Sequence, residues 1–221
     1  MQAWYKAGRG TMAQLPVKPS KIIGVGRNYR AHAAEMGNPI PTEPLLFFKP
    51  PSALIGDGQA IIRPRWVERM DYEGELAIVI GRRCRRVARG DALDVIGGYT
   101  ILNDVTAREL QKKDGQFTRA KGFDTFCPVG PRVVAGLDPA ALAIETRVNG
   151  AVRQKAPTAD MIFDVSTIVE YVTRVMTLEE GDVISTGSPP GVGPLVAGDV
   201  VEIEIAGIGV LRNPVVDEEN I

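Results

Sequence analysis

Glycine and proline recur along this sequence so often that any regular element has to be short. The 221 residues include 24 glycines and 16 prolines. Both residue types favour turns, because glycine adopts left-handed backbone angles and proline lacks the N–H group that ladders and helices use. The chain is therefore predicted to be an α+β protein that is mainly β, with many short strands and a few short helices.

Short apolar runs between these turns give the expected strands, which fall at residues 22–25, 45–49, 75–80, 98–102, 144–148, 183–185 and 200–205. Asn149-Gly150 is a strong type I′ hairpin signal and would return the chain through residues 152–154. A helix is expected over residues 27–36 from their composition. Residues 164–176 predict an amphipathic helix, because apolar side chains recur at helical spacing at Val165, Ile168, Val169, Val172 and Met176.

Three carboxylates fall in two short stretches of this pattern. Glu73 and Glu75 share one face of a predicted strand, and Asp104 ends a later apolar strand. Like charges this close destabilise one another unless a cation lies between them, and ligands made only of oxygen favour Mg²⁺, Mn²⁺ or Ca²⁺. The alternative is a solvated strand face, with Asp104 capping the helix that follows it. Spacing alone leaves both interpretations open.

The single histidine of the chain, His32, has Glu35 three residues after it. Residues at this spacing are neighbours on a helix, and a carboxylate beside an imidazole fixes its tautomer and raises its basicity. The pair would suit a general base that takes a proton from water. The alternative is a surface helix with an incidental histidine and a solvated glutamate.

Six sequence runs, taken in order, resemble the fumarylacetoacetate hydrolase superfamily. They are G-V-G-R-N-Y-R-A-H-A-A-E, E-P-L-L-F-F-K-P, D-Y-E-G-E-L-A-I-V-I-G, G-Y-T-I-L-N-D-V-T-A-R-E-L-Q, K-G-F-D-T-F-C-P-V-G-P and V-I-S-T-G-S-P-P-G-V-G-P. The likeness extends over residues 21–215 and is greatest to the short, single-domain acylpyruvase and oxaloacetate decarboxylase branch. It implies a mixed β-sandwich or β-roll of the type of that family's C-terminal domain, usually as a homodimer.

The resemblance also implies a role for each matching residue. Glu73, Glu75 and Asp104 are similar to the family's ligands for Mg²⁺ or Mn²⁺, and His32 with Glu35 resembles its water-activating pair. Lys121 resembles the lysine that faces the substrate oxygens and supports negative charge. The side chains that would bind the substrate are Arg108 and Gln111 in the cavity, and Thr186 with Gly187 in the loop that meets the substrate carboxylate.

The activity implied by this resemblance is cleavage of the C3–C4 bond of a short 2-oxo or 2,4-dioxo acid. Acylpyruvates, fumarylpyruvate and oxaloacetate are candidate substrates, and each reaction passes through a pyruvate enolate stabilised by the metal and Lys121. One alternative is an isomerase or decarboxylase that acts on a hydroxymuconate-type dienoate in aromatic catabolism. Keto–enol tautomerisation of oxaloacetate is another, and a ligand-binding module without activity is a third.

Composition narrows the possible partners and location. A net charge of −1 argues against nucleic acid, and the cluster of Arg82, Arg83, Arg85, Arg86 and Arg89 is interpreted as a solvated hairpin because no aromatic residue interrupts it. No stretch is apolar enough to span a bilayer, and the spacing of the two cysteines fits free thiols in a reducing compartment. A cytoplasmic enzyme is therefore expected, with an N-terminal arm or β extension at 1–20 and a catalytic domain at 21–221.

Overall fold

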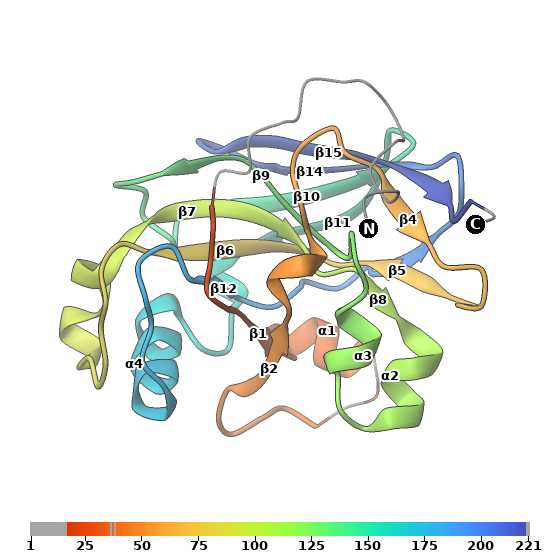
Figure 1. Ribbon diagram of the computed structural model, residues 1–221. Helices are drawn as coiled ribbons and strands as arrows, with labels where there is room; N and C mark the ends of the chain where they lie inside the picture. Colours follow the sequence, from red (N-terminus) through yellow and green to blue (C-terminus); the bar gives the residue numbers. More distant parts are fainter. Residues whose placement is uncertain (1–16, 36, 38, 220–221) are drawn as a thin grey trace, which may run out of the picture.

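The computed structural model describes residues 17–35, 37 and 39–219. The expected arm at residues 1–20 therefore falls mostly outside the described residues, and so does the last residue of the helix expected over 27–36. Within the described part, strands make up most of the regular structure and the helices are short (Figure 1). The prediction of a mainly β protein is confirmed.

The largest sheet has seven strands and carries the candidate site. Its order is β2 (Leu45–Lys49), β1 (Ile22–Gly26), β12 (Val183–Ser185), β6 (Gly74–Ile80), β7 (Ile96–Asn103), β9 (Cys127–Val134) and β3 (Leu54–Ile55). β1 and β12 are parallel, whereas β6 and β7 are antiparallel with Gly74 opposite Asn103. That register brings the start of β6 beside the end of β7.

Two smaller sheets complete the β structure of the described residues. The five-stranded one has the order β11 (Ala151–Pro157), β10 (Ala143–Val148), β14 (Val200–Ile205), β15 (Gly209–Asp217) and β4 (Ile61–Arg63). The three-stranded one has the order β13 (Gly193–Leu195), β5 (Met70–Tyr72) and β8 (Thr106–Ala107). The β10–β11 hairpin turns at Asn149 and Gly150, whose φ angles of 51° and 78° are both positive, as a type I′ turn requires.

The main hydrophobic core lies between the seven-stranded and five-stranded sheets. Leu76 and Ile78 of β6 belong to the same cluster as Ile144 of β10 and Ile203 of β14, and all four are fully or almost fully buried. Because side chains alternate along a strand, the intervening Ala77 and Val79 point to the opposite face, where they join a second, smaller cluster. Glu73 and Glu75 share the odd-numbered positions of this second face.

In Figure 1 the labelled helices lie at the bottom of the view, near β1 and β2, whereas β14 and β15 lie at the top. The helices are α1 (Arg30–Glu35), α2 (Arg108–Asp114), α3 (Thr118–Lys121) and α4 (Val165–Val175), with three short 3₁₀ helices at Pro51–Ala53, Arg89–Val95 and Thr158–Asp160. The predicted amphipathic helix is α4, which begins after the capping residue Asp164 and buries Ile168, Val169 and Val172 in the main core. In the described residues no helix is both long enough and apolar enough to cross a bilayer.

Candidate metal centre and active site

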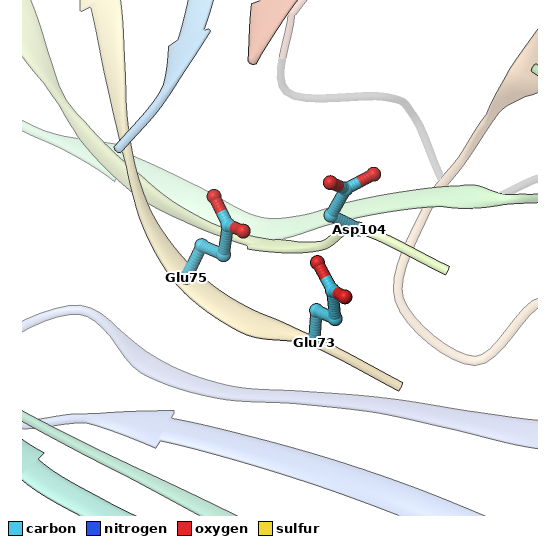
Figure 2. A group of neighbouring side chains, drawn as sticks. All are labelled: Glu73, Glu75 and Asp104. Carbon is cyan, nitrogen blue, oxygen red and sulfur yellow. The ribbon is translucent and has the colours of Figure 1, made fainter. Parts of the chain in front are cut away.

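The three acidic residues singled out by the sequence meet where β6 begins and β7 ends. Glu73 directly precedes β6, Glu75 is its second residue, and Asp104 directly follows β7, where its N–H donates to the Glu73 carbonyl at 2.8 Å. One carboxylate oxygen from each lies within 4.8 Å of the others, and all three residues are buried. Figure 2 shows the three carboxylates converging from neighbouring strands. This carboxylate trio offers only oxygen donors.

The charges within and around the trio indicate whether a cation would be stabilised there. Burial, followed by the charges of Asp104 and Glu73, raises the pKa of Glu75 well above its ordinary value. The Ser185 hydroxyl and the Gly187 N–H, the latter at 2.7 Å, donate to Glu75 but leave its charge beside two others. A divalent ion would remove that repulsion, and an all-oxygen donor set suits Mg²⁺ or Mn²⁺ better than Zn²⁺. The residues present therefore fit a hard divalent cation.

Two predicted cationic residues contact the trio directly. The Lys121 ammonium donates to Glu73 at 2.9 Å, to Thr106 at 2.7 Å and also to Asp104. Arg108 donates to Glu73 as well, and its Nε lies 2.7 Å from Asp71. Burial alone would raise the pKa of Glu73, but Arg108 and Lys121 outweigh it and hold that pKa below the ordinary value. The negative charge of Glu73 is therefore balanced by two cationic side chains, whereas the charge of Glu75 is not.

A second buried lysine, Lys49, contacts the trio and was not singled out from the sequence. Its Nζ donates to Asp104 at 2.6 Å and to the Val105 carbonyl at 3.3 Å, and the residue is 1% exposed. The signal was present in the run L-L-F-F-K, because a lysine that ends an apolar strand has to find a partner if it is buried. The trio is thus surrounded by Lys49, Lys121 and Arg108.

His32 and Glu35 meet on α1 as their spacing predicted. Nδ1 of His32 lies 3.4 Å from Oε2 of Glu35, and the same carboxylate accepts from the Gly191 N–H at 3.1 Å. His32 is buried, while the side chain of Glu35 is 40% exposed. The pair is therefore placed with its histidine inward and its carboxylate at the surface.

A cavity of about 780 Å³ joins the histidine to the trio. Glu73, Asp104 and Lys121 line it together with His32. Arg108 and Gln111, which hydrogen bond to each other at 2.9 Å, also line it, so both expected cavity residues reach the cavity. The apolar side chains in its lining come from Val25, Leu45, Leu46, Phe47, Phe48 and Phe117.

The loop between β12 and β13, residues 186–192, meets this cavity through Ser188. The Thr186 hydroxyl donates to the Leu76 carbonyl at 2.8 Å, and the Gly187 N–H donates to Glu75. Thr186 and Gly187 thereby anchor the loop to β6, and their expected contact with a substrate carboxylate stays a prediction. Gly187 has a φ of +99°, which changes the direction of the chain just before Ser188.

The fold and the cavity together define a small β-rich domain in which buried carboxylates and a histidine line one cavity. Residues 21–216 match the protein family described as fumarylacetoacetate (FAA) hydrolase C-terminal. This match covers most of the chain, and the chain therefore belongs to the fumarylacetoacetate hydrolase family of enzymes. The resemblance noted from the sequence is confirmed.

Named relatives of the chain differ in the reaction that their names state. Oxaloacetate tautomerase YisK of Bacillus subtilis is 46% identical over 217 residues, which cover 92% of this chain and 72% of the relative. The structure of a 5-carboxymethyl-2-hydroxymuconate delta-isomerase from Mycobacterium smegmatis superposes with a TM-score of 0.88 at 51% identity, over 93% of this chain and 82% of that one.

A third relative was solved with ligands in place. The maleylpyruvate hydrolase of Sphingobium sp. SYK-6, in complex with manganese(II) and pyruvate, has a TM-score of 0.79 at 41% identity over 91% of this chain and 72% of that one. Together the three names describe a tautomerase, an isomerase and a hydrolase. Proteins similar to this chain are thus named for more than one reaction.

Proposed function

We propose that this protein is a divalent-metal-dependent enzyme that converts a short 2-oxo acid by way of its enolate. The observation that carries this proposal is a single cavity lined by Glu73 and Asp104 of the carboxylate trio, by the Lys121 ammonium and by His32. An enolate needs positive charge beside its oxygen and a base for its proton, and this cavity offers both.

Each residue of the proposed site has a distinct task. Glu73, Glu75 and Asp104 would hold Mg²⁺ or Mn²⁺, which when bound supplies a Lewis acid for substrate oxygens. Lys121, buried at 2% exposure, places a positive charge where water screens it little. Arg108 orients Glu73 and Gln111 by hydrogen bonds to both.

Proton transfer falls to His32 and Glu35. Glu35 accepts from Nδ1 of His32, so the tautomer that we assign leaves Nε2 as the acceptor. Nε2 can then take a proton from carbon 3 of a 2-oxo acid and return it to the substrate. The same nitrogen can instead take a proton from water, which would then add to a 4-oxo carbon. One base therefore serves tautomerisation and hydrolysis.

Keto–enol tautomerisation of oxaloacetate is the reaction that we assign first. The names of the tautomerase and the isomerase both describe proton shifts, and these relatives are 46% and 51% identical to the chain. Hydrolysis of the C3–C4 bond of an acylpyruvate is the second candidate. It is favoured by the His32–Glu35 pair beside the cavity and by the maleylpyruvate hydrolase at 41% identity.

The deciding experiment supplies four substrates to the purified protein with Mg²⁺, Mn²⁺ or a chelator. Loss of the oxaloacetate enol is followed by absorbance, pyruvate release from acetylpyruvate and fumarylpyruvate by a coupled assay, and isomerisation of a hydroxymuconate by its spectrum. We expect the enol to disappear fastest, and only with metal. Equal rates in chelator would exclude the proposed metal dependence.

One substitution, compared with a surface control, tests the role of His32 as the base. His32→Ala should lower tautomerisation and acylpyruvate hydrolysis by roughly 10²- to 10⁴-fold, while oxaloacetate decarboxylation, which needs no base, is expected to suffer less. Glu180→Gln changes an exposed carboxylate and is the matched surface control. Equal losses of all three reactions in His32→Ala would show that His32 is no dedicated base.

A further inference from the structure

The β12–β13 loop contacts both halves of the proposed site. Near its start the Gly187 N–H donates to Glu75 Oε2 at 2.7 Å, and near its end the Gly191 N–H donates to Glu35 Oε2 at 3.1 Å. One backbone segment therefore joins the carboxylate trio to the histidine–glutamate pair. The position of Gly191 helps to set where the Glu35 carboxylate lies.

Gly191 is itself held by a buried tyrosine. The Tyr72 hydroxyl on β5 donates to the Gly191 carbonyl at 2.8 Å, and Tyr72 is 3% exposed. A tyrosine hydroxyl keeps its proton at neutral pH, so it can act as the donor in this hydrogen bond. Gly191 has a φ of +95°, a backbone conformation that glycine adopts readily. The hydrogen bond from Tyr72 to its carbonyl restricts the backbone freedom of this glycine.

The first half of the loop has a separate support. Nε2 of Gln154 donates to the Ser188 hydroxyl and to the Pro189 carbonyl, each at 2.8 Å, and Oε1 of Gln154 accepts from the Gly74 N–H at 3.0 Å. Loss of the Tyr72 hydroxyl would leave these bonds and the Gly187 contact in place. The end of the loop can therefore be released without releasing Glu75.

We propose that Tyr72 is a positioning residue for the His32–Glu35 pair. Its hydroxyl holds Gly191, Gly191 holds the Glu35 carboxylate, and that carboxylate lies 3.4 Å from Nδ1 of His32. Tyr72 is not among the residues that line the cavity, so it acts through this chain of contacts. The inference rests on the proposed function in one respect, that the pair moves a proton during turnover.

The test compares Tyr72→Phe with Tyr99→Phe, which removes the hydroxyl of another buried tyrosine, on β7. Because the chain has one histidine, the imidazole ¹⁵N signals of labelled protein report His32 alone. We expect Tyr72→Phe to shift these signals and to speed hydrogen exchange of the Gly191 amide about 10-fold. Tyr99→Phe should change neither. Unchanged imidazole signals in Tyr72→Phe would overturn the proposal, whether or not any substrate is turned over.

Kinetics give a second readout. Tyr72→Phe should lower kcat about 10-fold with KM and the Mn²⁺ dissociation constant unchanged, since a misplaced base slows proton transfer without weakening binding. In a Glu35→Gln background the same change should add no further loss. A fall in Mn²⁺ affinity equal to the fall in kcat would instead mean that Tyr72 acts through its neighbour Glu73, and would refute the positioning role.

Discussion

Glu75 has the least compensated charge of the carboxylate trio. Lys121 contacts both Glu73 and Asp104, and Lys49 adds a second cation to Asp104. Among the described residues, the groups that donate to Glu75 are a hydroxyl and a backbone N–H, both neutral. A buried carboxylate in this setting destabilises the metal-free protein and stabilises a bound cation. The charge of Glu75 is therefore expected to favour metal binding and, at the same time, to destabilise the metal-free protein.

Substituting Glu75 should separate these two effects. Glu75→Gln keeps an acceptor for Ser185 and Gly187 but removes the charge, so we expect the midpoint of thermal unfolding in chelator to equal or exceed that of the wild type. Mn²⁺ at 100 times its dissociation constant should stabilise the wild type by about 2.7 kcal/mol and the variant far less. Calorimetric melts with and without Mn²⁺ measure both. A variant stabilised by Mn²⁺ as strongly as the wild type would remove Glu75 from the ligand set.

One buried carboxylate holds the starts of the parallel strands β1 and β12 together by hydrogen bonds. Asp182, directly before β12, accepts from the Ser20 N–H at 2.9 Å, the Lys21 N–H at 3.1 Å and the Glu179 N–H at 2.7 Å, and Lys21 adds an ion pair. Burial would raise the pKa of Asp182, but these hydrogen bonds outweigh it and lower that pKa. Since β1 leads into α1, this carboxylate also fixes the strand that carries His32 to the cavity.

Asp182→Asn should therefore destabilise the protein in a pH-dependent way. Loss of the ion pair and of acceptor capacity should cost about 2–3 kcal/mol of unfolding free energy at neutral pH. Asp182 has a lowered pKa in the folded protein. Its contribution to stability is therefore fully present above its unfolded-state pKa of about 3.9, and it is lost as the pH falls through its folded-state pKa. Urea unfolding of both proteins from pH 7 to pH 3 measures this. A difference that stays constant, or grows, below pH 4 would contradict the assignment.

Local sequence pattern predicted most elements of the fold. The runs at residues 45–49, 183–185 and 200–205 are the strands β2, β12 and β14, because apolar alternation and flanking turns are properties of neighbouring residues. The helix expected over residues 27–36 begins three residues later, at Arg30, after Arg27 adopts a left-handed φ of 58°. Glu73 falls just outside its expected strand, between β5 and β6.

Two contacts between distant segments of the chain were not predicted from the sequence. Lys49 is 55 residues from Asp104, and Gln154 is 80 residues from Gly74, so strand order decides both contacts. The orientation of Thr186 depends on the backbone angles of its loop. The metal, the role of each site residue, the homodimer and the cytoplasmic location stay predictions.

The seven-stranded and five-stranded sheets approach each other closely beside the trio. Gly74, between Glu73 and Glu75, faces the five-stranded sheet, and a Cβ at this position would lie 2.3 Å from Oγ1 of Thr146 and 3.2 Å from Ile203. Because Gly74 has no side chain, the strand that carries the carboxylates can pack directly against the five-stranded sheet. Gly74 therefore affects both the packing of the two sheets and the geometry of the carboxylate trio.

Gly74→Ala should consequently disturb stability and metal binding together. The added methyl group has to push the sheets apart or displace Thr146, and overpacking of this kind costs about 1–3 kcal/mol. Gly90→Ala is the matched control, because no atom lies within 4 Å of a Cβ there. We expect chemical unfolding to show a loss in Gly74→Ala and almost none in Gly90→Ala, and calorimetry to show weaker Mn²⁺ binding in Gly74→Ala alone. Unchanged Mn²⁺ affinity in a destabilised Gly74→Ala protein would show that the trio does not depend on how the sheets pack.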